Sequence, residues 1–410
     1  MSTAWFISRR LIAATNAKKS FSRPVIRLSV AAIAFSVAVM IISMATGLGL
    51  QIEIKNRLTS FSGHVSLRSY ESSIGLEHSP ILPESEWIED IAALPGVTAM
   101  QAIGNRAGII KSASFFEGAI FKGIDAEYNA PFIENSLESG KVPDLTLEQP
   151  NDSILVSRYL YDLLAIDEGE RIAMYFFRPA PQPPLLRYFY ISGIYSTGLE
   201  QIDEQLVLGD LRHLLRVNGW DSNAVGGFEI FLDKGYDMDE MAAVIRERVP
   251  YDVEAISARA QYEQVFQWVD LFDVNILIIF IVMLIVSAIN ISSALMIMLL
   301  ERTRMIGTLK AMGASNALVR KIFLNKSAYL ISLGLLWGNF IGLGFAFVQY
   351  YFEPIKLDQS VYYVSAVPIH LHWSWIVGIN AVTIAFCLLC LLLPSLYISR
   401  IKPAKTIAFR

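Results

Sequence analysis

Cysteine and charged residues are scarce in this sequence, which limits the disulfides it can form and the class of protein it can belong to. Only two of its 410 residues are cysteines, Cys387 and Cys390, and both lie in one uncharged run near the C-terminus. We therefore expect no disulfide to brace any other part of the chain. Charged residues make up 18% of the sequence and hydrophobic residues 54%, which is typical of a membrane protein with a large polar domain.

The usual signs of a catalytic centre are also missing. No Gly-x-x-x-x-Gly-Lys-Ser/Thr loop is present, so we do not expect this chain to bind or hydrolyse ATP itself. Its five histidines show no spacing typical of metal ligands, and no nucleophile elbow occurs. The sequence therefore predicts a protein that is not an enzyme and holds no metal or cofactor of its own.

Four uncharged runs are each long enough to cross a bilayer, which takes about 20 residues in a helix. They are residues 28–50, 274–300, 327–352 and 373–399. The long polar stretch between the first two alternates helix-like and strand-like patterns. The predicted fold is a four-helix transmembrane protein with a large external α+β domain inserted between the first and second membrane helices.

Positive charge gives the orientation. Residues 1–27, 301–326 and 400–410 are rich in Lys and Arg and nearly free of acids, so both termini and the middle loop are predicted to be cytoplasmic. A polar, basic stretch precedes the first run, so we expect an uncleaved anchor rather than a signal peptide. The predicted segments are a cytoplasmic interfacial helix 1–27, spans 28–50, 273–300, 327–352 and 373–399, an external two-lobed domain 51–272, a cytoplasmic coupling loop 301–326, a short external loop 353–372, and a cytoplasmic tail 400–410.

The spans differ in their small residues. Gly334, Gly338 and Gly342 repeat at every fourth position of the third run, which predicts a close helix–helix contact. The first run mixes small and flexible side chains, a composition that suits either helix packing or an irregular apolar ligand.

The external domain contains one unusual connection. We expect helices over residues 84–94, 157–164 and 237–248, and strands over 97–103, 171–177 and 187–195. The last two strands are joined by residues 178–186, which contain four prolines. Such a loop is stiff and extended, and it is either a rigid connection or a hairpin that captures a partner. The residues of interest are Phe177, Arg178, Pro179, Pro181, Pro183, Pro184, Leu185 and Leu186.

The basic loop between the second and third runs is patterned as a helix. Met305, Leu309 and Met312 form a narrow apolar stripe with Ile306 beside it. Gly313 is suited to end this helix and Ser315 to cap the next one. The pattern alone is compatible with a helix that lies in a groove of a partner and equally with a loop that only fixes topology.

The amino-acid sequence of this loop resembles the coupling segment of the FtsX/MacB-type ABC transporter permeases. Ile306-Gly307, Leu309-Lys310-Ala311 and Gly313-Ala314-Ser315 match that segment, whereas Met305 stands where the family commonly has a carboxylate. The resemblance implies a contact with a cytoplasmic ABC ATPase, made by Arg304, Met305, Ile306, Gly307, Leu309, Lys310, Met312 and Gly313.

The residues on either side of the first uncharged run, 28–50, resemble one branch of this family more specifically. Ser20-Phe21-Ser22-Arg23-Pro24 and Gly63-His64-Val65 are similar to the lipoprotein-releasing permeases of the LolC/LolE type. This branch implies a transmembrane subunit in the bacterial inner membrane that extracts lipoproteins and hands them to a periplasmic carrier. The implied partners are a dimer of ATPase subunits that binds ATP and Mg, a second permease subunit (the same chain or a paralogue), the carrier, the lipoproteins and membrane lipids, but no nucleic acid.

The same resemblance implies two further sites. The proline-rich hairpin corresponds to the hook that engages the carrier, and lipoproteins enter beside the first membrane helix, near Ser36, Met40, Ser43 and Met44. Two alternatives within the wider family are an FtsX-like regulatory scaffold and a MacB-like mechanotransmission efflux permease. The second usually carries its own fused ATPase domain.

Overall fold

The computed structural model describes residues 22–395 except 73–76, 84, 127, 129, 167–169, 179–180, 222, 359–361 and 363. The chain folds as two compact units. The membrane unit comprises Met1–Gln51, Asp270–Lys356 and Ala366–Arg410, and the external unit comprises Ile52–Val269 and Leu357–Ser365. Most of the expected interfacial helix 1–27 and the whole tail 400–410 lie outside the described residues.

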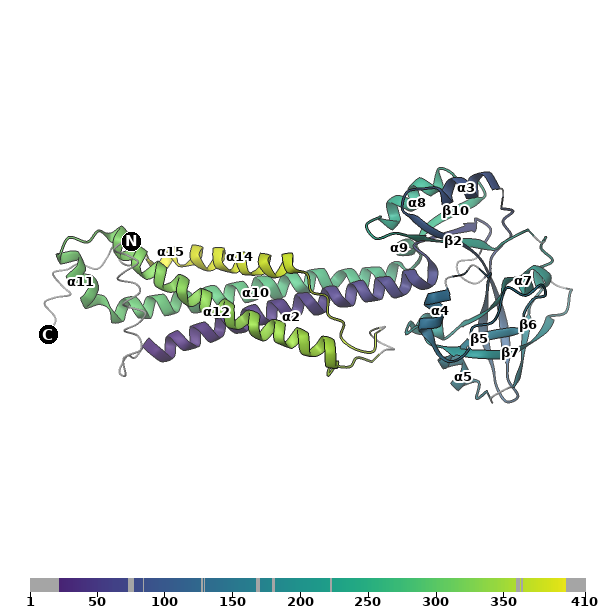
Figure 1. The fold of residues 1–410 in the computed structure, drawn as a ribbon, viewed down its shortest axis with the longest axis horizontal. Helices are drawn as coiled ribbons and strands as arrows, with labels where there is room; N and C mark the ends of the chain where they lie inside the picture. The colour runs from purple at the N-terminus through teal and green to yellow at the C-terminus, as the bar shows by residue number, and fades with distance from the viewer. Residues whose placement is uncertain are drawn as a thin grey trace. The chain divides into compact units, whose positions relative to one another are not determined.

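Four long apolar helices build the membrane unit and confirm the predicted fold class. Each is long and apolar enough to cross a membrane, and the four run alongside one another (Figure 1). They are α2 (Ser22–Ser62), α10 (Glu263–Glu301), α12 (Asn316–Phe352) and α14 (Trp373–Cys390), followed by the short α15 (Leu392–Ser395). With 41 and 39 residues, α2 and α10 are nearly twice as long as one crossing requires, and both continue into the external unit.

The glycine face of α12 packs against α2. A side chain at Gly334 or Gly338 would collide with α2, and a Cβ at Gly342 would lie only 3.1 Å from the Ile41 Cβ. The repeated glycines therefore let two membrane helices approach closely within one subunit, as small residues do in other membrane bundles.

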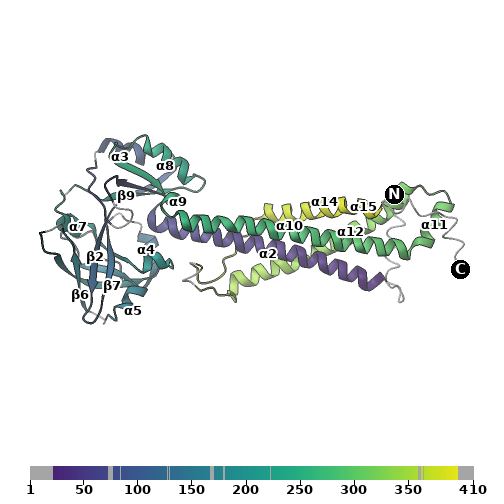
Figure 2. The ribbon, with the colours of Figure 1, turned by 180° about the vertical axis from the view of Figure 1, so that it is seen from behind.

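The small lobe of the external unit is a sheet covered by two helices. Strands β10 (Val253–Ser257), β1 (Val65–Ser69) and β9 (Gly227–Leu232) pair in that order with the first half of β2 (Val97–Lys111). Helices α3 (Ser85–Ala92) and α8 (Met238–Arg246) lie together over this sheet (Figure 2). Trp87 and Ile91 of α3 and Met241 and Ile245 of α8 are buried in the same apolar core.

The second lobe is a closed barrel of six strands. The second half of β2 pairs with β3 (Phe116–Ile124), and the ring continues through β8 (Leu206–Asp210), β5 (Ser153–Ser157), β7 (Leu185–Tyr195) and β6 (Arg171–Phe176) back to β2. Strand β4 (Leu137–Gly140) adds to β7. The helices of this lobe are α4 (Ala130–Ser136), α5 (Arg158–Leu163), α6 (Glu200–Asp203) and α7 (Leu211–Asn218), and α9 (Ala258–Gln261) leads to α10.

Strand β2 is the element that the two lobes share. We expected a strand over residues 97–103 only, and this was too short, because β2 has 15 residues. Its first half pairs with β9 and its second half with β3 and β6. One strand thus belongs to both sheets, which a local sequence pattern does not reveal.

Candidate functional site

The basic loop folds as a short helix between two sharp turns. Helix α11 (Thr303–Ala311) follows α10 almost directly. Gly313 has φ +91°, the left-handed conformation that ends many helices. The Ser315 hydroxyl accepts a hydrogen bond from the Leu318 N–H at 3.3 Å and caps α12. The predicted turn chemistry is therefore confirmed at both residues.

The faces of α11 differ from the expected stripe. Ile306 and Gly307 are buried, and Met305 packs against the buried Ile322 of α12. Leu309 and Lys310 are half-buried, whereas Met312 is 72% exposed. The stripe therefore does not face outward as a whole, because Met305 and the neighbouring Ile306 pack α11 against the membrane helices of the same chain. The outward face consists of Arg304, Thr308, Ala311 and Met312.

The proline-rich connection forms the tip of the β6–β7 hairpin. Phe176 pairs with Leu185 and Tyr175 with Leu186. Both leucines therefore belong to β7, and our expectation that they lie in the loop was wrong. Leu185 packs against the barrel core, which contains the fully buried Phe176. The apolar contact at this pair extends the strands and leaves, of the described residues, 177–178 and 181–184 in the loop. Pro179 lies outside the described residues.

The hairpin tip is braced by arginines. Arg178 donates from Nε and Nη2 to the Pro183 carbonyl oxygen at 3.3 and 3.1 Å, and Arg106 donates to the Phe177 carbonyl oxygen. Phe177 is 50% exposed, and the described loop residues Pro181, Gln182, Pro183 and Pro184 are also exposed. The loop therefore presents an aromatic side chain from a restrained backbone.

An aromatic surface lies on the outer face of the same hairpin, toward the end opposite the loop. Tyr188 and Tyr190 are both about half exposed, and the Arg171 guanidinium lies 4.6 and 5.5 Å from their ring centroids. Tyrosine and arginine are enriched at protein interfaces because they combine apolar area with a polar end. The loop and this surface have the residue composition of a protein-binding region, of which the sequence indicated only the loop.

The first membrane helix places the four expected cavity residues in two different settings. Ser36 and Met40 are only 0% and 1% exposed, and Met40 lies in a core built with α10 and α12. These two residues therefore pack within the subunit and do not line an accessible cavity in it. Ser43 and Met44 are half-buried.

A different face of the same helix is hollowed. An almost wholly apolar groove of about 470 Å³ lies between α2 and α12. The walls on α2 include Ala31, Ala34, Phe35 and Ala38, and those on α12 include Leu333, Trp337 and Ile341. The repeat of alanines at positions 31, 34 and 38 was a signal for this groove in the sequence.

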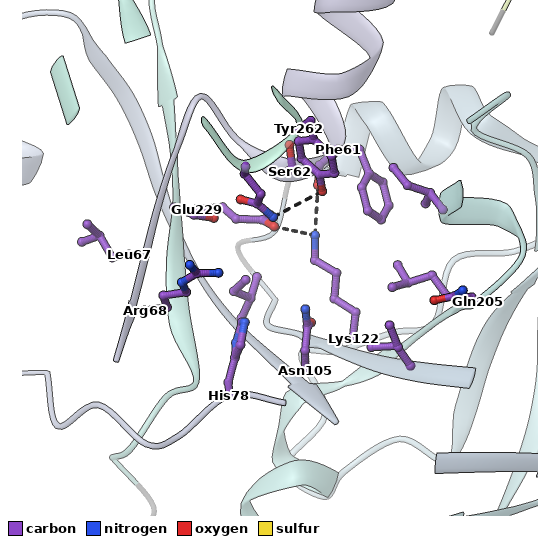
Figure 3. Close-up of a pocket in the computed structure, with 16 residues that line it drawn as sticks. Phe61, Ser62, Leu67, Arg68, His78, Asn105, Lys122, Gln205, Glu229 and Tyr262 are labelled. Atoms are coloured by element: carbon purple, nitrogen blue, oxygen red, sulfur yellow. Dashed lines mark hydrogen bonds and ion pairs between the residues drawn. The ribbon is translucent and has the colours of Figure 1, made fainter. Parts of the chain in front are cut away.

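Sequence reasoning missed a polar pocket inside the external unit. The pocket has a volume of about 270 Å³, and its lining includes His78, Lys122, Glu229 and Tyr262 (Figure 3). His78 is 8% exposed, and among the described residues its Nδ1 has no hydrogen-bond partner. Burial lowers the pKa of His78 to about 4, and the charges of Lys122 and Arg68 act in the same direction. In the part of the chain that the structure describes, no group of three or more His, Cys, Asp or Glu side chains is placed to hold a metal ion.

The chain is similar in sequence to known transmembrane proteins. Residues 277–403 match the family described as FtsX-like permease C-terminal. The chain is 23% identical over 429 residues to the lipoprotein-releasing system transmembrane protein LolC of Neisseria meningitidis serogroup B, with 99% of each chain covered. It is 20% identical over 438 residues to LolE of Haemophilus influenzae, with 100% of each covered. The periplasmic region of MacB from Actinobacillus actinomycetemcomitans matches 52% of this chain and 97% of that chain, at 10% identity and a TM-score of 0.35.

The matched family region contains α11, α12 and α14. It therefore includes the basic turn that the sequence singled out and the helices on either side of it. Proteins of this family are non-catalytic transmembrane subunits. The chain is thus an FtsX-family ABC transporter permease, a multi-pass membrane subunit whose family implies a partner ATPase.

Proposed function

We propose that this permease extracts lipoproteins from the bacterial inner membrane and passes them to a soluble periplasmic carrier. The proposal is supported by similarity along the whole chain to proteins named LolC and LolE. The observation that carries it is the β6–β7 hairpin, whose braced, proline-rich tip exposes Phe177. A restrained loop loses little conformational entropy when it binds, which suits the capture of a partner that must then be released.

The remaining parts have complementary roles in this proposal. The outward face of α11 contacts the cytoplasmic ATPase, which binds ATP and Mg, and both chain termini lie on the same side of the membrane. The lipid-modified end of the substrate lies against the first membrane helix, near Ser43 and Met44. A second permease subunit, identical or paralogous, closes the other side of this space.

Carrier binding by the hairpin is the step that the structure makes easiest to test. Phe177→Ser removes an exposed aromatic side chain without touching the barrel core, so the permease should fold normally and bind the carrier at least about tenfold more weakly. Tyr251→Ser is the matched control, because Tyr251 is 95% exposed on the small lobe. Binding of the purified carrier to the full-length permease is measured by biolayer interferometry. Equal affinity of wild type and Phe177→Ser would contradict the assignment of the hairpin as the carrier site.

A further inference from the structure

A buried ion pair connects the two lobes of the external unit. The Lys122 Nζ lies 2.7 Å from the Glu229 Oε1, and the two side chains are 3% and 4% exposed. Lys122 belongs to β3 of the barrel lobe and Glu229 to β9 of the small lobe. Among the ion pairs within the described ranges, it is the one in which both partners are almost completely buried.

The same ion pair holds the end of the first long helix. The Phe61 carbonyl oxygen, in the last turn of α2, accepts from the Lys122 Nζ at 2.9 Å and from the Tyr128 hydroxyl at 3.1 Å. The Lys122 Nζ also lies 4.3 Å from the centroid of the Phe61 ring. The last carbonyls of a helix have no partner within the helix and carry partial negative charge. Lys122 therefore caps α2 from the barrel lobe.

Packing fixes this helix end to the small lobe as well. Gly63 follows α2 with φ +71°, and a Cβ at this position would lie only 3.1 Å from the Glu229 Cβ and from the Ile230 backbone. The Tyr128 hydroxyl also lies 2.9 Å from the Glu229 Oε2, so its single proton is within reach of both the helix end and the carboxylate. The end of α2, β3 and β9 thus meet at one point.

The start of the second long helix lies at the same place. Tyr262, directly before α10, lines the pocket together with Ser62, Lys122 and Glu229 (Figure 3). Burial, followed by the charge of Glu229, raises the pKa of Tyr262 to about 12, and its hydroxyl is hydrogen-bonded to the Ser62 side chain. Both long helices therefore enter the external unit beside the ion pair.

Stability alone does not account for a buried pair at this position. Removing two charges from water costs about as much as their attraction returns, and replacement of such pairs by uncharged side chains is often neutral for folding. A hydrogen-bonded pair does, however, fix the geometry of the elements that it joins. We propose that Lys122 and Glu229 form a joint that transmits movement of α2 to both lobes at once. This inference rests on the proposed function only in requiring that an ATPase drives the movement.

The joint is tested with a variant that removes both charges together. Lys122→Met/Glu229→Gln keeps the side-chain lengths, leaves no unpaired charge and retains an acceptor for the Tyr128 hydroxyl. Arg68→Met/Glu254→Gln is the matched control, since this pair joins β1 to β10 within the small lobe at 3.3 Å. Nitroxide labels are placed on the exposed residues Glu240 and Lys141, one in each lobe, after Cys387 and Cys390 are replaced by Ala.

Pulsed electron paramagnetic resonance then measures the distance between the lobes in the full permease–ATPase complex with and without ATP. We expect ATP to change the distance between the lobes in wild type and in the control pair but not in the joint variant. In the joint variant, ATPase turnover should stay within about twofold of wild type, and lipoprotein release should fall by about tenfold. An unchanged ATP-driven distance shift in the folded joint variant would overturn the proposal. If the joint variant does not fold, Tyr128→Phe, which keeps the ring and the ion pair, should reduce the shift, and an unchanged shift in it would also overturn the proposal.

The two readouts separate the joint from the transport reaction. Movement of the lobes without lipoprotein release in wild type would contradict the proposed function and leave the joint supported. Normal release with normal lobe movement in the joint variant would contradict the joint and leave the proposed function supported.

Discussion

Gly338 of α12 faces Val37 of α2 at a distance that leaves no room for a side chain. A Cβ at Gly338 would lie 2.7 Å from the Val37 Cβ and 2.8 Å from the Ala34 carbonyl oxygen. Because the second neighbour is backbone, the collision cannot be relieved by a side-chain rotation. The contact between these two residues therefore sets how closely the first and third membrane helices approach.

The first prediction is that Gly338→Ala destabilises the membrane unit by about 1–3 kcal/mol, the usual result of overpacking a filled core. Gly344→Ala is the control on the same helix, where a Cβ would have no neighbour within 4 Å. It should be neutral or slightly stabilising, because Ala favours a helix more than Gly does. Thermal unfolding of the purified protein in detergent compares the two variants. Equal melting temperatures would show that the α2–α12 contact is looser than the structure indicates.

The second prediction concerns the contact with the ATPase. Met312→Asp places a charge on the outward face of α11 and should reduce co-purification with the ATPase by about tenfold. Asn316→Asp is the control, because it adds the same charge at the exposed first turn of α12, where negative charge is favourable. If Met312→Asp co-purified with the ATPase as well as wild type does, this face of α11 would not be part of the interface. Ile306→Asp should instead unfold the turn, since Ile306 is 0% exposed.

The third prediction is a pH dependence of the external unit. Burial lowers the pKa of His78 to about 4, whereas in the unfolded chain histidine titrates near 6.5. Between these values the unfolded chain binds a proton that the folded chain does not, so stability falls as the pH falls from about 6.5 to 4. Over this pH range, the free energy of unfolding should fall by about 3 kcal/mol because of His78.

His78→Gln cannot titrate and should weaken this dependence. Exposed His372 provides the control variant His372→Gln, which should melt like the wild type across the same range. Melting temperatures of the full-length protein at pH 7, 6, 5 and 4 provide the comparison. The same slope in His78→Gln and wild type would mean that His78 is not held neutral by burial.

The fourth prediction distinguishes the two faces of the first membrane helix. A photo-crosslinking side chain at Phe35, which is 63% exposed and lines the α2–α12 groove, should capture lipid or a neighbouring chain. The same group at Met44, which is half-buried, should capture lipoprotein in membranes where the full transporter is present. Met40 should crosslink only within its own subunit, because it is 1% exposed. Efficient capture of lipoprotein from Met40 would contradict the packing of the bundle.

The features that the sequence predicted well are those that depend on neighbouring residues. The four spans follow from local hydropathy, the turn at Gly313 and Ser315 from local conformational preference, and the glycine face from a repeat within one helix. The features it predicted poorly depend on distant pairing. Lys122 and Glu229 are 107 residues apart in the chain, and neither has a neighbour in sequence that indicates an ion pair.

Two errors at the candidate sites have the same origin. Leu185 was included in the loop 178–186, but its pairing with Phe176 makes it part of β7. Met40 was assigned to a cavity from the family resemblance, but it lies in a core with side chains of α10 and α12. Composition gives the chemistry of a helix face, and only the arrangement of the other helices decides whether that face is accessible.

The most direct test of lipoprotein release is reconstitution of the permease with its ATPase in proteoliposomes that contain a triacylated lipoprotein. Transfer of the lipoprotein to the soluble carrier is measured after addition of ATP, with a non-hydrolysable ATP analogue as the control. We expect transfer that requires both ATP hydrolysis and the carrier and that is strongly reduced by Phe177→Ser. ATP hydrolysis by the assembled complex without any transfer of lipoprotein to the carrier would contradict the proposed function.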